Sequence, residues 1–406
     1  MTLKKNIPII QKILMLLVFL LLPIAVYAPL FFAVMLPVIT LFFAVFKFTH
    51  EKQIFRPNRV LTIFLLTLII TSAFSGFWAY DTALVIEKLP RTAITFVTGA
   101  FLLTMASNCT AEFRLTISKV LVVGFGLAII LILIERLAEG LIFAGPEAVG
   151  KITFMNQFNR PLIILSILIW PTAILLSRRH LFFGILAVSG FFILNLWFDT
   201  NAARLAIAVG ALSSLFVYLG AKRSGIILSI VLTSGVILSP VIERVLPPPQ
   251  KMFSSLNLPR SAYHRLLVWN FTTDKIMQKP ILGWGFNNSR EIPGGKSNLD
   301  ESEAALPLHP HNAALQWWLE LGAVGAIICA GIVLLATESA RLRVQGRMEK
   351  AFVFGTIASV YTVSMLSFGI WQTWWLSFLF LTTALTILLC APRFEQTQST
   401  QSTTTK

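Results

Sequence analysis

Residues 8–46 read PIIQKILMLLVFLLLPIAVYAPLFFAVMLPVITLFFAVF, which is two apolar runs that meet at Ala28. Each run approaches the roughly 20 residues that a helix needs to cross a bilayer. Lys4 and Lys5 precede the first run as they would in a secretory signal, but no small-residue cleavage site follows and a second apolar run begins at once. We therefore interpret both runs as membrane-spanning helices.

The rest of the chain repeats this pattern. Of its 406 residues, 56% are hydrophobic and 13% are charged, and the mean hydropathy is +0.78. No water-soluble domain of this size could bury so much apolar surface, so the composition excludes a soluble globular protein, a disordered chain and a coiled coil. We predict an all-α polytopic membrane protein with about twelve transmembrane helices. The candidate spans are residues 8–27, 29–46, 60–77, 92–107, 118–136, 161–177, 181–197, 205–221, 225–242, 313–337, 351–370 and 376–391.

The basic residues of the short connectors predict how the chain is oriented. If both termini are cytoplasmic, most Lys and Arg residues of these connectors, including Arg178 and Arg179, lie on the cytoplasmic face, as the positive-inside rule requires. The net charge of +15 then indicates an anionic bilayer surface as the partner and not nucleic acid. The predicted parts are helices 1–9 (residues 1–242), a large periplasmic loop (243–312), helices 10–12 (313–391) and a disordered cytoplasmic tail (392–406).

The loop 243–312 breaks the apolar pattern with many Pro and Gly residues. Inside it, residues 261–279 predict an amphipathic helix, with Ser261 as a plausible N-cap. Arg265 and Trp269 are four residues apart and therefore share a face of that helix. Loops of this length in compact proteins are usually functional. We expect this loop to fold against the periplasmic surface of the membrane that the chain spans, and to contain the active site.

Histidine is the first candidate for chemistry. Three of the five histidines, His264, His309 and His311, lie in this loop. His311 is followed by Asn312 and then by an apolar helix, so it lies where the chain returns to the membrane. A neutral imidazole there could take a proton from an attacking hydroxyl. An interfacial histidine that only binds carbonyls or water has the same sequence pattern and is the more common case.

Arginines outside the cytoplasm are the second candidate. Arg160 and Arg204 open two spans, and Arg265 lies on the loop helix. A guanidinium offers paired planar donors that suit a phosphate or pyrophosphate, and a position at the outer face runs against the positive-inside bias. For any single arginine, extension of the side chain to lipid headgroups is the simpler explanation. Three such residues near a histidine-bearing loop favour an anionic, lipid-linked substrate.

The remaining motifs indicate no metal and no cofactor. The acidic run 300–303 has no second cluster and is typical of a solvated turn. The segment 283–286, Gly-Trp-Gly-Phe, lacks the strand and helix of a phosphate-binding loop, so we interpret it as a fold element. Catalysis without a metal is therefore the simpler hypothesis.

Several motifs together resemble one known family. His311-Asn312, nine residues and then Gly322-x-x-Gly325 are similar to the H-N-x9-G-x-x-G pattern of the O-antigen ligase and polymerase superfamily of bacterial envelope glycosyltransferases. The other similar segments are Arg265-x-x-x-Trp269 followed by Pro280-x-x-Gly283-x-Gly285, Asn201-Ala202-Ala203-Arg204, and Phe158-Asn159-Arg160, the last as in ligases. His309 is a departure from the pattern, and Pro310 between the two histidines means that they need not share a site.

The resemblance implies an inverting, metal-independent glycosyl transfer at the periplasmic face of the bacterial inner membrane. The implied donor is a glycan on undecaprenyl pyrophosphate, and the implied acceptor is a sugar hydroxyl of the lipid A core. Carried onto this chain, His311 would be the general base, while Arg204 and Arg265 would hold the pyrophosphate, with Arg160 as a third candidate. The expected supporting residues are Asn312, His309, Trp269, Gly283, Gly285, Gly322 and Gly325.

Alternatives remain open at this point. An O-antigen polymerase or a protein O-oligosaccharyltransferase of the same superfamily would use the same donor with another acceptor. The Phe-Asn-Arg segment, the single histidine-bearing loop and the absence of a separate soluble domain favour a ligase. A transporter of lipid-linked glycans would also need many spans, but transporters usually place ionisable groups at the bilayer midplane and show internal repeats, and neither is clear here.

Overall fold

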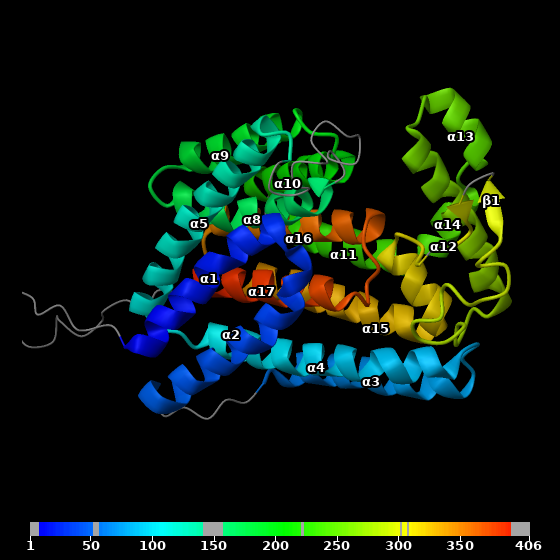
Figure 1. Ribbon diagram of the computed structural model, residues 1–406, viewed down its shortest axis with the longest axis horizontal. Helices are drawn as coiled ribbons and strands as arrows, with labels where there is room; N and C mark the ends of the chain where they lie inside the picture. Colours follow the sequence, from blue (N-terminus) through cyan, green and yellow to red (C-terminus); the bar gives the residue numbers. More distant parts are fainter. Residues whose placement is uncertain are drawn as a thin grey trace, which may run out of the picture.

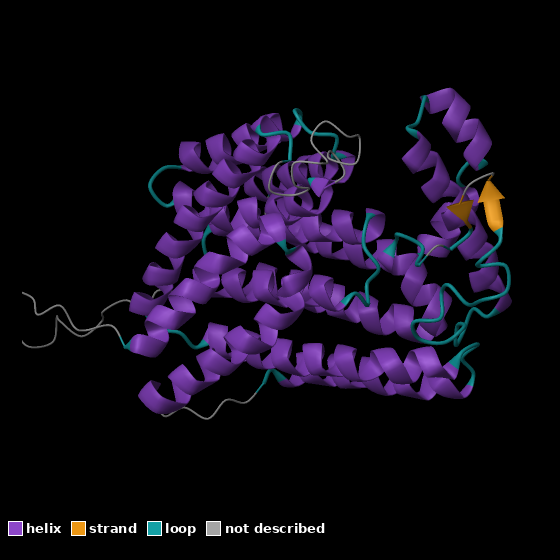
Figure 2. Cartoon of the chain, in the orientation of Figure 1, coloured by secondary structure: helices purple, strands orange, loops and turns teal. Residues whose placement is uncertain are grey.

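The computed structural model describes residues 8–51, 57–140, 157–220, 223–300, 303–306 and 308–390. Within them the chain is helical apart from loops and one short antiparallel hairpin (Figure 2). The first elements are α1 (Ile9–Tyr27), η1 (Pro29–Phe31), α2 (Phe32–Phe46), η2 (Lys47–Glu51), α3 (Arg59–Phe74), η3 (Ser75–Phe77), α4 (Thr82–Ser107), α5 (Ala111–Leu137), α8 (Asn159–Ser177), α9 (Leu181–Asn195) and α10 (Asn201–Leu219). They are followed by α11 (Ser224–Ile237), α12 (Ser239–Val245), α13 (Pro249–Leu256), α14 (Arg260–Gln278), β1 (Asn298–Asp300), β2 (Glu303–Ala304), α15 (Ala313–Arg343), α16 (Arg347–Leu366) and α17 (Thr373–Cys390).

The all-α membrane fold is confirmed. In the described part of the chain, nine helices are long and apolar enough to cross a membrane, and α11 with α12 would make a tenth. Each of the twelve predicted ranges contains a helix, but three are not simple spans. α9 has 15 residues, about 22 Å of helix. α16 begins with the charged residues Arg347, Glu349 and Lys350, and α11 and α12 are bent by 75° at their junction.

α4 and α5 begin well before the predicted spans, because each helix has a side-chain cap. The Asp81 carboxylate accepts a hydrogen bond from the first turn of α4, and the Thr110 hydroxyl does the same for α5. A cap satisfies backbone N–H groups, so the helix begins at the cap and not at the first apolar residue. Lys88 and Arg91 therefore lie on α4, which runs beside α3 along one edge of the bundle (Figure 1).

α8, α10 and α16 pack together inside the bundle. The indole N–H of Trp170 donates to Ser359 Oγ (2.7 Å), and that hydroxyl donates to the carbonyl of Ala206 (2.7 Å). Further along the same helix pair, the guanidinium of Arg347 donates to the carbonyl of Tyr218. α10 and α16 are therefore antiparallel, and the start of α10 lies beside the end of α16.

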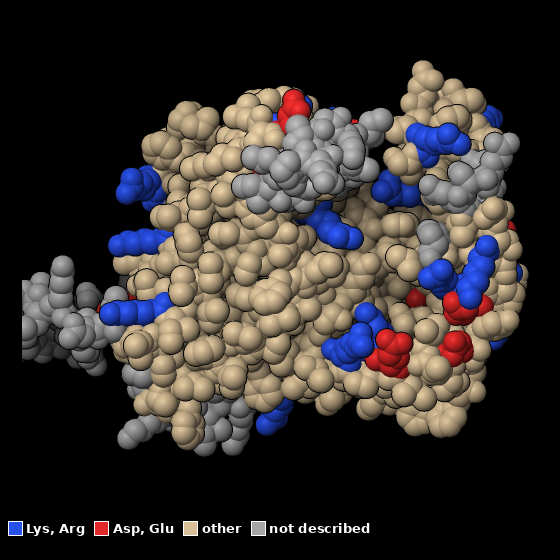
Figure 3. Space-filling model, viewed as in Figure 1, with Lys and Arg blue, Asp and Glu red and all other residues tan. Residues whose placement is uncertain are grey.

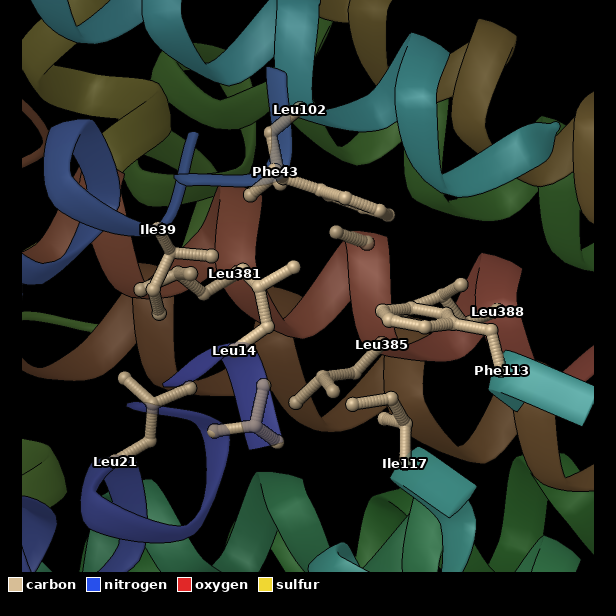
Figure 4. A pocket seen from close by; sticks show the side chains of 12 residues that line it. Leu14, Leu21, Ile39, Phe43, Leu102, Phe113, Ile117, Leu381, Leu385 and Leu388 are labelled. Atoms are coloured by element: carbon tan, nitrogen blue, oxygen red, sulfur yellow. The ribbon is translucent and has the colours of Figure 1, made fainter. Parts of the chain in front are cut away.

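An apolar cavity lies among α1, α2, α4, α5 and α17 (Figure 4). Its lining consists of aliphatic and aromatic side chains such as Leu14, Phe43, Phe113 and Leu385. Leu14 is near the start of α1 and Leu385 is in the last turns of α17, so the cavity lies toward the described chain ends. None of its side chains can bind a phosphate or accept a proton, so this cavity is a packing gap and not a candidate active site.

Candidate active site

The predicted loop helix is present as α14, which covers Arg260–Gln278. Its N-cap is Pro259 and not Ser261, which lies in the first turn, because proline with its fixed φ can lead directly into a helix. The indole N–H of Trp269 donates to the carbonyl of Pro310 (2.9 Å). α14 is thereby fixed to the segment that contains the two neighbouring histidines.

His311 has an unusual backbone and an oriented ring. Its φ of 55° lies in the left-handed region, which is uncommon for residues other than glycine. Its Nδ1 lies 2.7 Å from the carbonyl oxygen of Ser367, the residue that ends α16. A carbonyl can only accept, so Nδ1 carries the proton and Nε2 is the basic nitrogen. Asn312 caps α15 by accepting a hydrogen bond from the Leu315 N–H (3.1 Å).

His309 supports the backbone of His311. Its Nδ1 accepts a hydrogen bond from the His311 N–H (3.1 Å), and the two ring centroids are 4.4 Å apart. Its side chain is buried against Gly369, where a Cβ would lie 2.6 Å from the imidazole. Burial, and next the charge of His311, lower the pKa of His309 to about 3. His309 is therefore neutral at physiological pH, as an acceptor at Nδ1 must be.

The two glycine motifs meet at a break in α15. Gly322 has φ 61° and ψ −158°, so the helix is interrupted there. The segment 280–285 supplies the hydrogen-bond partners that the interrupted helix lacks. The four backbone N–H to carbonyl bonds are Trp284 to Leu319 (2.8 Å), Gly285 to Glu320 (2.8 Å), Ala323 to Pro280 (2.8 Å) and Val324 to Ile281 (3.4 Å). The Pro-x-x-Gly-x-Gly and Gly-x-x-Gly motifs are thus two halves of one joint.

Both sides of this joint require glycine. A Cβ on Gly322 would lie 2.3 Å from the carbonyl carbon of Ile281, and a Cβ on Gly283 would lie 2.5 Å from that of Glu320. Each has a positive φ as well. Backbone cannot move aside as a flexible side chain can, so any larger residue would separate the two segments. Gly325 lies in the part of α15 that follows the break.

The turn between α3 and α4 packs on the other side of this segment. Its indole and backbone N–H groups bind carbonyls in 282–284, and Asn288 binds the backbone of Asp81 in both directions. The bonds are Trp78 Nε1 to Leu282 O (3.1 Å), Tyr80 N to Trp284 O (3.3 Å), Asp81 N to Asn288 Oδ1 (2.6 Å) and Asn288 Nδ2 to Asp81 O (3.0 Å). Gly285 allows close contact here, since its Cβ would lie 2.5 Å from Ala79.

Arg204 lies at the same end of the bundle as His311. Its guanidinium donates to the carbonyl of Phe198 (3.2 Å) and lies 3.6 Å from Asp199, while its buried Nε has no partner among the described residues. Ala206 on α10 and Ser359 on the antiparallel α16 are bonded and so lie at the same level. Arg204 is two residues before Ala206, and Ser367 is eight residues after Ser359. At 1.5 Å per residue, Arg204 and Ser367 are about 9 Å apart along the helix axes.

The other two arginines lie near these elements. Arg160 is exposed at the start of α8, and the preceding Phe158 packs on Phe198 with ring centroids 4.9 Å apart. Arg160 is therefore near the segment that holds Arg204. Arg265 is half-buried, donates to the carbonyl of Ser261 (3.3 Å), and has its pKa lowered by burial. It lies one helical turn from Trp269, and thus near Pro310.

Charged side chains gather toward the ends of the molecule, and the face between them is almost entirely uncharged (Figure 3). The surface is indented between the part that contains α13 and the main helical body. α14, with Arg265, packs against α13 and α15 beside this indentation. In the described residues, no group of three or more His, Cys, Asp and Glu side chains is placed to hold a metal ion. The acidic run 300–303 lies partly outside those residues.

Sequence reasoning missed Glu320 and Gln316, which are buried on α15 with Trp371 nearby. The missed signal was Glu320 itself, because an ionisable residue inside an apolar span usually has a functional reason. Gln316 and Trp371 have no such signature, since a buried glutamine and an interfacial tryptophan are both common.

Comparisons with known proteins agree with these motifs. Residues 186–330 match the family model described as O-antigen ligase. This range contains Arg204, Arg265, His311 and both glycine motifs. The chain is 30% identical over 284 residues to a protein of Rickettsia prowazekii provisionally named a polysaccharide ligase, covering 68% of each chain. Proteins with that provisional name from Rickettsia conorii and Rickettsia felis are each 29% identical, the first over 76% of both chains and the second over 81% of this chain and 82% of the relative.

Proposed function

Because the chain belongs to the O-antigen ligase superfamily, we propose that it transfers a glycan from undecaprenyl pyrophosphate to a sugar hydroxyl of the lipid A core. The observation that carries the mechanism is the bond from His311 Nδ1 to the Ser367 carbonyl. It fixes the tautomer and leaves Nε2 as the proton acceptor. We propose that the reaction is inverting and needs no metal ion.

In this mechanism the acceptor hydroxyl attacks the anomeric carbon of the donor glycan. Its proton passes to Nε2 of His311, and the bond from the anomeric carbon to the pyrophosphate oxygen breaks with its electron pair on that oxygen. The imidazolium that forms lies at the C-terminal end of α16, because Ser367 is the C-cap of that helix. A helix C-terminus stabilises a nearby cation, so this placement favours proton uptake.

Arg204 and Arg265 would stabilise the departing pyrophosphate. Negative charge grows on this group as the bond breaks, so guanidinium donors placed in advance lower the transition state more than the ground state. Burial of Arg265 strengthens its interaction with an anion, because less water screens the charge. Arg160, exposed near the segment of Arg204, would provide a further contact to the donor.

We also propose that both termini are cytoplasmic and that the site faces the periplasm of a bacterial inner membrane. The positive-inside bias of the connectors supports this orientation. The donor and acceptor would then both be lipids of the outer leaflet.

Purified protein in proteoliposomes tests the function. Given lipid-linked glycan and rough lipopolysaccharide, it should form capped lipopolysaccharide. Longer lipid-linked chains without capping would instead indicate a polymerase, and translocation of the donor without transfer would indicate a transporter. His311→Ala should lower the transfer rate by about 10²–10⁴-fold while donor binding persists. Retained turnover in that variant would place the base elsewhere.

A further inference from the structure

We propose that Gln316 and Glu320, one turn apart on α15, are positioning residues that hold the turn 367–371 where its Ser367 carbonyl orients His311. This inference rests on the proposed function, because that function makes His311 the base. Neither residue needs to touch the substrate. Their effect would pass through the turn to the imidazole.

Glu320 is the centre of a buried polar network. Its side chain is 1% exposed, and its two carboxylate oxygens accept four hydrogen bonds. The donors are Asn287 N (2.5 Å), Ser289 Oγ (2.5 Å), Gln316 Nε2 (3.0 Å) and Trp371 Nε1 (2.6 Å). A carboxylate out of water is costly unless it is bonded this fully, so the network fixes all of its members together.

Two bonds to side chains of α15 fix the turn that follows α16. Trp371 donates its indole N–H to Glu320, and the Ile370 N–H donates to Gln316 Oε1 (3.0 Å). The turn is thus attached to α15 at two adjacent residues, by one side-chain bond and one backbone bond. Its other end begins at Ser367, whose N–H donates to Val363 in the last turn of α16 (2.9 Å).

The same turn contacts both histidines. Ser367 accepts the Nδ1–H of His311, and Gly369 packs against the ring of His309. The carbonyl that selects the His311 tautomer is therefore held in place from α15, a helix that His311 itself precedes. If the turn shifted, His311 would lose the bond that keeps its Nε2 unprotonated, although the arginines would be unaffected.

A purely structural role is the competing explanation, since Glu320 also binds the segment 287–289. The two explanations differ in what they predict for kinetics. A positioning role lowers the rate of the chemical step and leaves donor affinity intact, because Arg204 and Arg265 belong to other elements. General distortion of the site would weaken binding and stability together with the rate.

Trp371→Phe is the sharpest test, because it removes one donor to Glu320 and retains a ring to pack on Phe286, whose centroid is 4.8 Å away. We expect kcat to fall about 10–100-fold, with the donor KM within about twofold and only a modest fall in the thermal midpoint, since Glu320 keeps three of its four donors. Gln316→Leu, which frees the Ile370 N–H, should behave in the same way. The matched control is Trp374→Phe, since the Trp374 indole donates to Gln372 and not to Glu320.

Measuring His311→Ala alongside keeps the two proposals separate. If that variant is inactive while Trp371→Phe matches Trp374→Phe, the positioning role is wrong and the base assignment stands. A fall in kcat accompanied by a proportionate rise in donor KM and a large fall in the thermal midpoint would also overturn the positioning role. Turnover by His311→Ala would instead contradict the proposed function.

Discussion

Two regions of the bundle are built on different principles. Around the apolar cavity, side chains such as Leu14, Phe43 and Leu385 pack without any polar partner in the lining. Around His311, buried polar groups are bonded to backbone far along the chain, and both His311 and Gly322 have a positive φ. Apolar packing tolerates small changes of shape, whereas directed bonds and strained backbone do not. We therefore expect substitutions in the first region to change stability alone, and those in the second to change stability, catalysis or both.

The largest expected effect is that of Gly322→Ala, which should prevent the joint between α15 and segment 280–285 from closing. The added Cβ would overlap the Ile281 backbone, and the φ/ψ pair is accessible essentially only to glycine. Folded yield in detergent and the thermal midpoint would both drop sharply. Gly126→Ala on α5 is the matched control, because its Cβ would meet nothing within 4 Å. A Gly322→Ala protein with wild-type stability would show that the joint is dispensable.

Arg265→Lys should lower the transfer rate by about 10²-fold, within the range for loss of one preorganised donor, although the charge is kept. An ammonium group lacks the planar pair of donors that matches a pyrophosphate. The comparison is with Arg260→Lys, an exposed residue at the start of the same helix. Steady-state transfer rates would be measured for both. Equal rates for the two variants would argue that paired donation by Arg265 is not used.

We expect a moderate dependence of the free energy of unfolding on pH, caused by His309. Its pKa of about 3 in the folded protein is below the usual 6.5, so between these values the unfolded chain binds a proton that the folded protein does not. The contribution of His309 to the free energy of unfolding is therefore fully present above about pH 6.5. It decreases as the pH falls toward 3, by at most about 1.4 kcal/mol per pH unit.

His309→Asn isolates that contribution, because it keeps an acceptor at the δ position and removes the titration. Its free energy of unfolding should depend less on pH between 6.5 and 3 than that of the wild type, with similar values above pH 7. Parallel curves for the two proteins would show that His309 does not titrate as expected.

The smallest effect is expected at the cavity. Leu14→Val removes one buried methylene and should cost about 1 kcal/mol of stability without changing the transfer rate. Leu315→Val, next to the Asn312 cap, is the equivalent change in the other region, and we expect its transfer rate to fall severalfold as well. If the two variants lost activity equally, the contrast between the regions would not hold.

Local sequence pattern predicted the helices well, because each apolar run specifies its own helix. It predicted α14 within one residue at each end, and it identified segment 283–286 as an element of the fold. The same pattern did not distinguish continuous spans from other apolar helices, since hydropathy does not show that α11 and α12 bend sharply or that α9 is short. It also missed that Asp81 starts α4 early, because a cap lies outside the apolar run.

The support of the site could not be predicted from local pattern. Glu320 lies on α15 and Trp371 lies 51 residues later, in the turn between α16 and α17, so their spacing in the sequence does not indicate that they are bonded. The assignment of His311 as the base, and of the three arginines to the pyrophosphate, remains a prediction. The fold brings their elements to one end of the bundle, and kinetics must decide what they do there.

The break in α15 means that the first part of that helix sets a fixed distance between the histidine segment and the joint at Gly322. At its start, His311 is bonded to Ser367, and at its end, around Gly322, the helix is bonded to segment 280–285. One inserted or deleted residue between them would rotate the histidine by about 100° around the helix axis and shift it by about 1.5 Å. A change in the length of this stretch should therefore inactivate the protein, even if the bonds of Gln316 and Glu320 could still form.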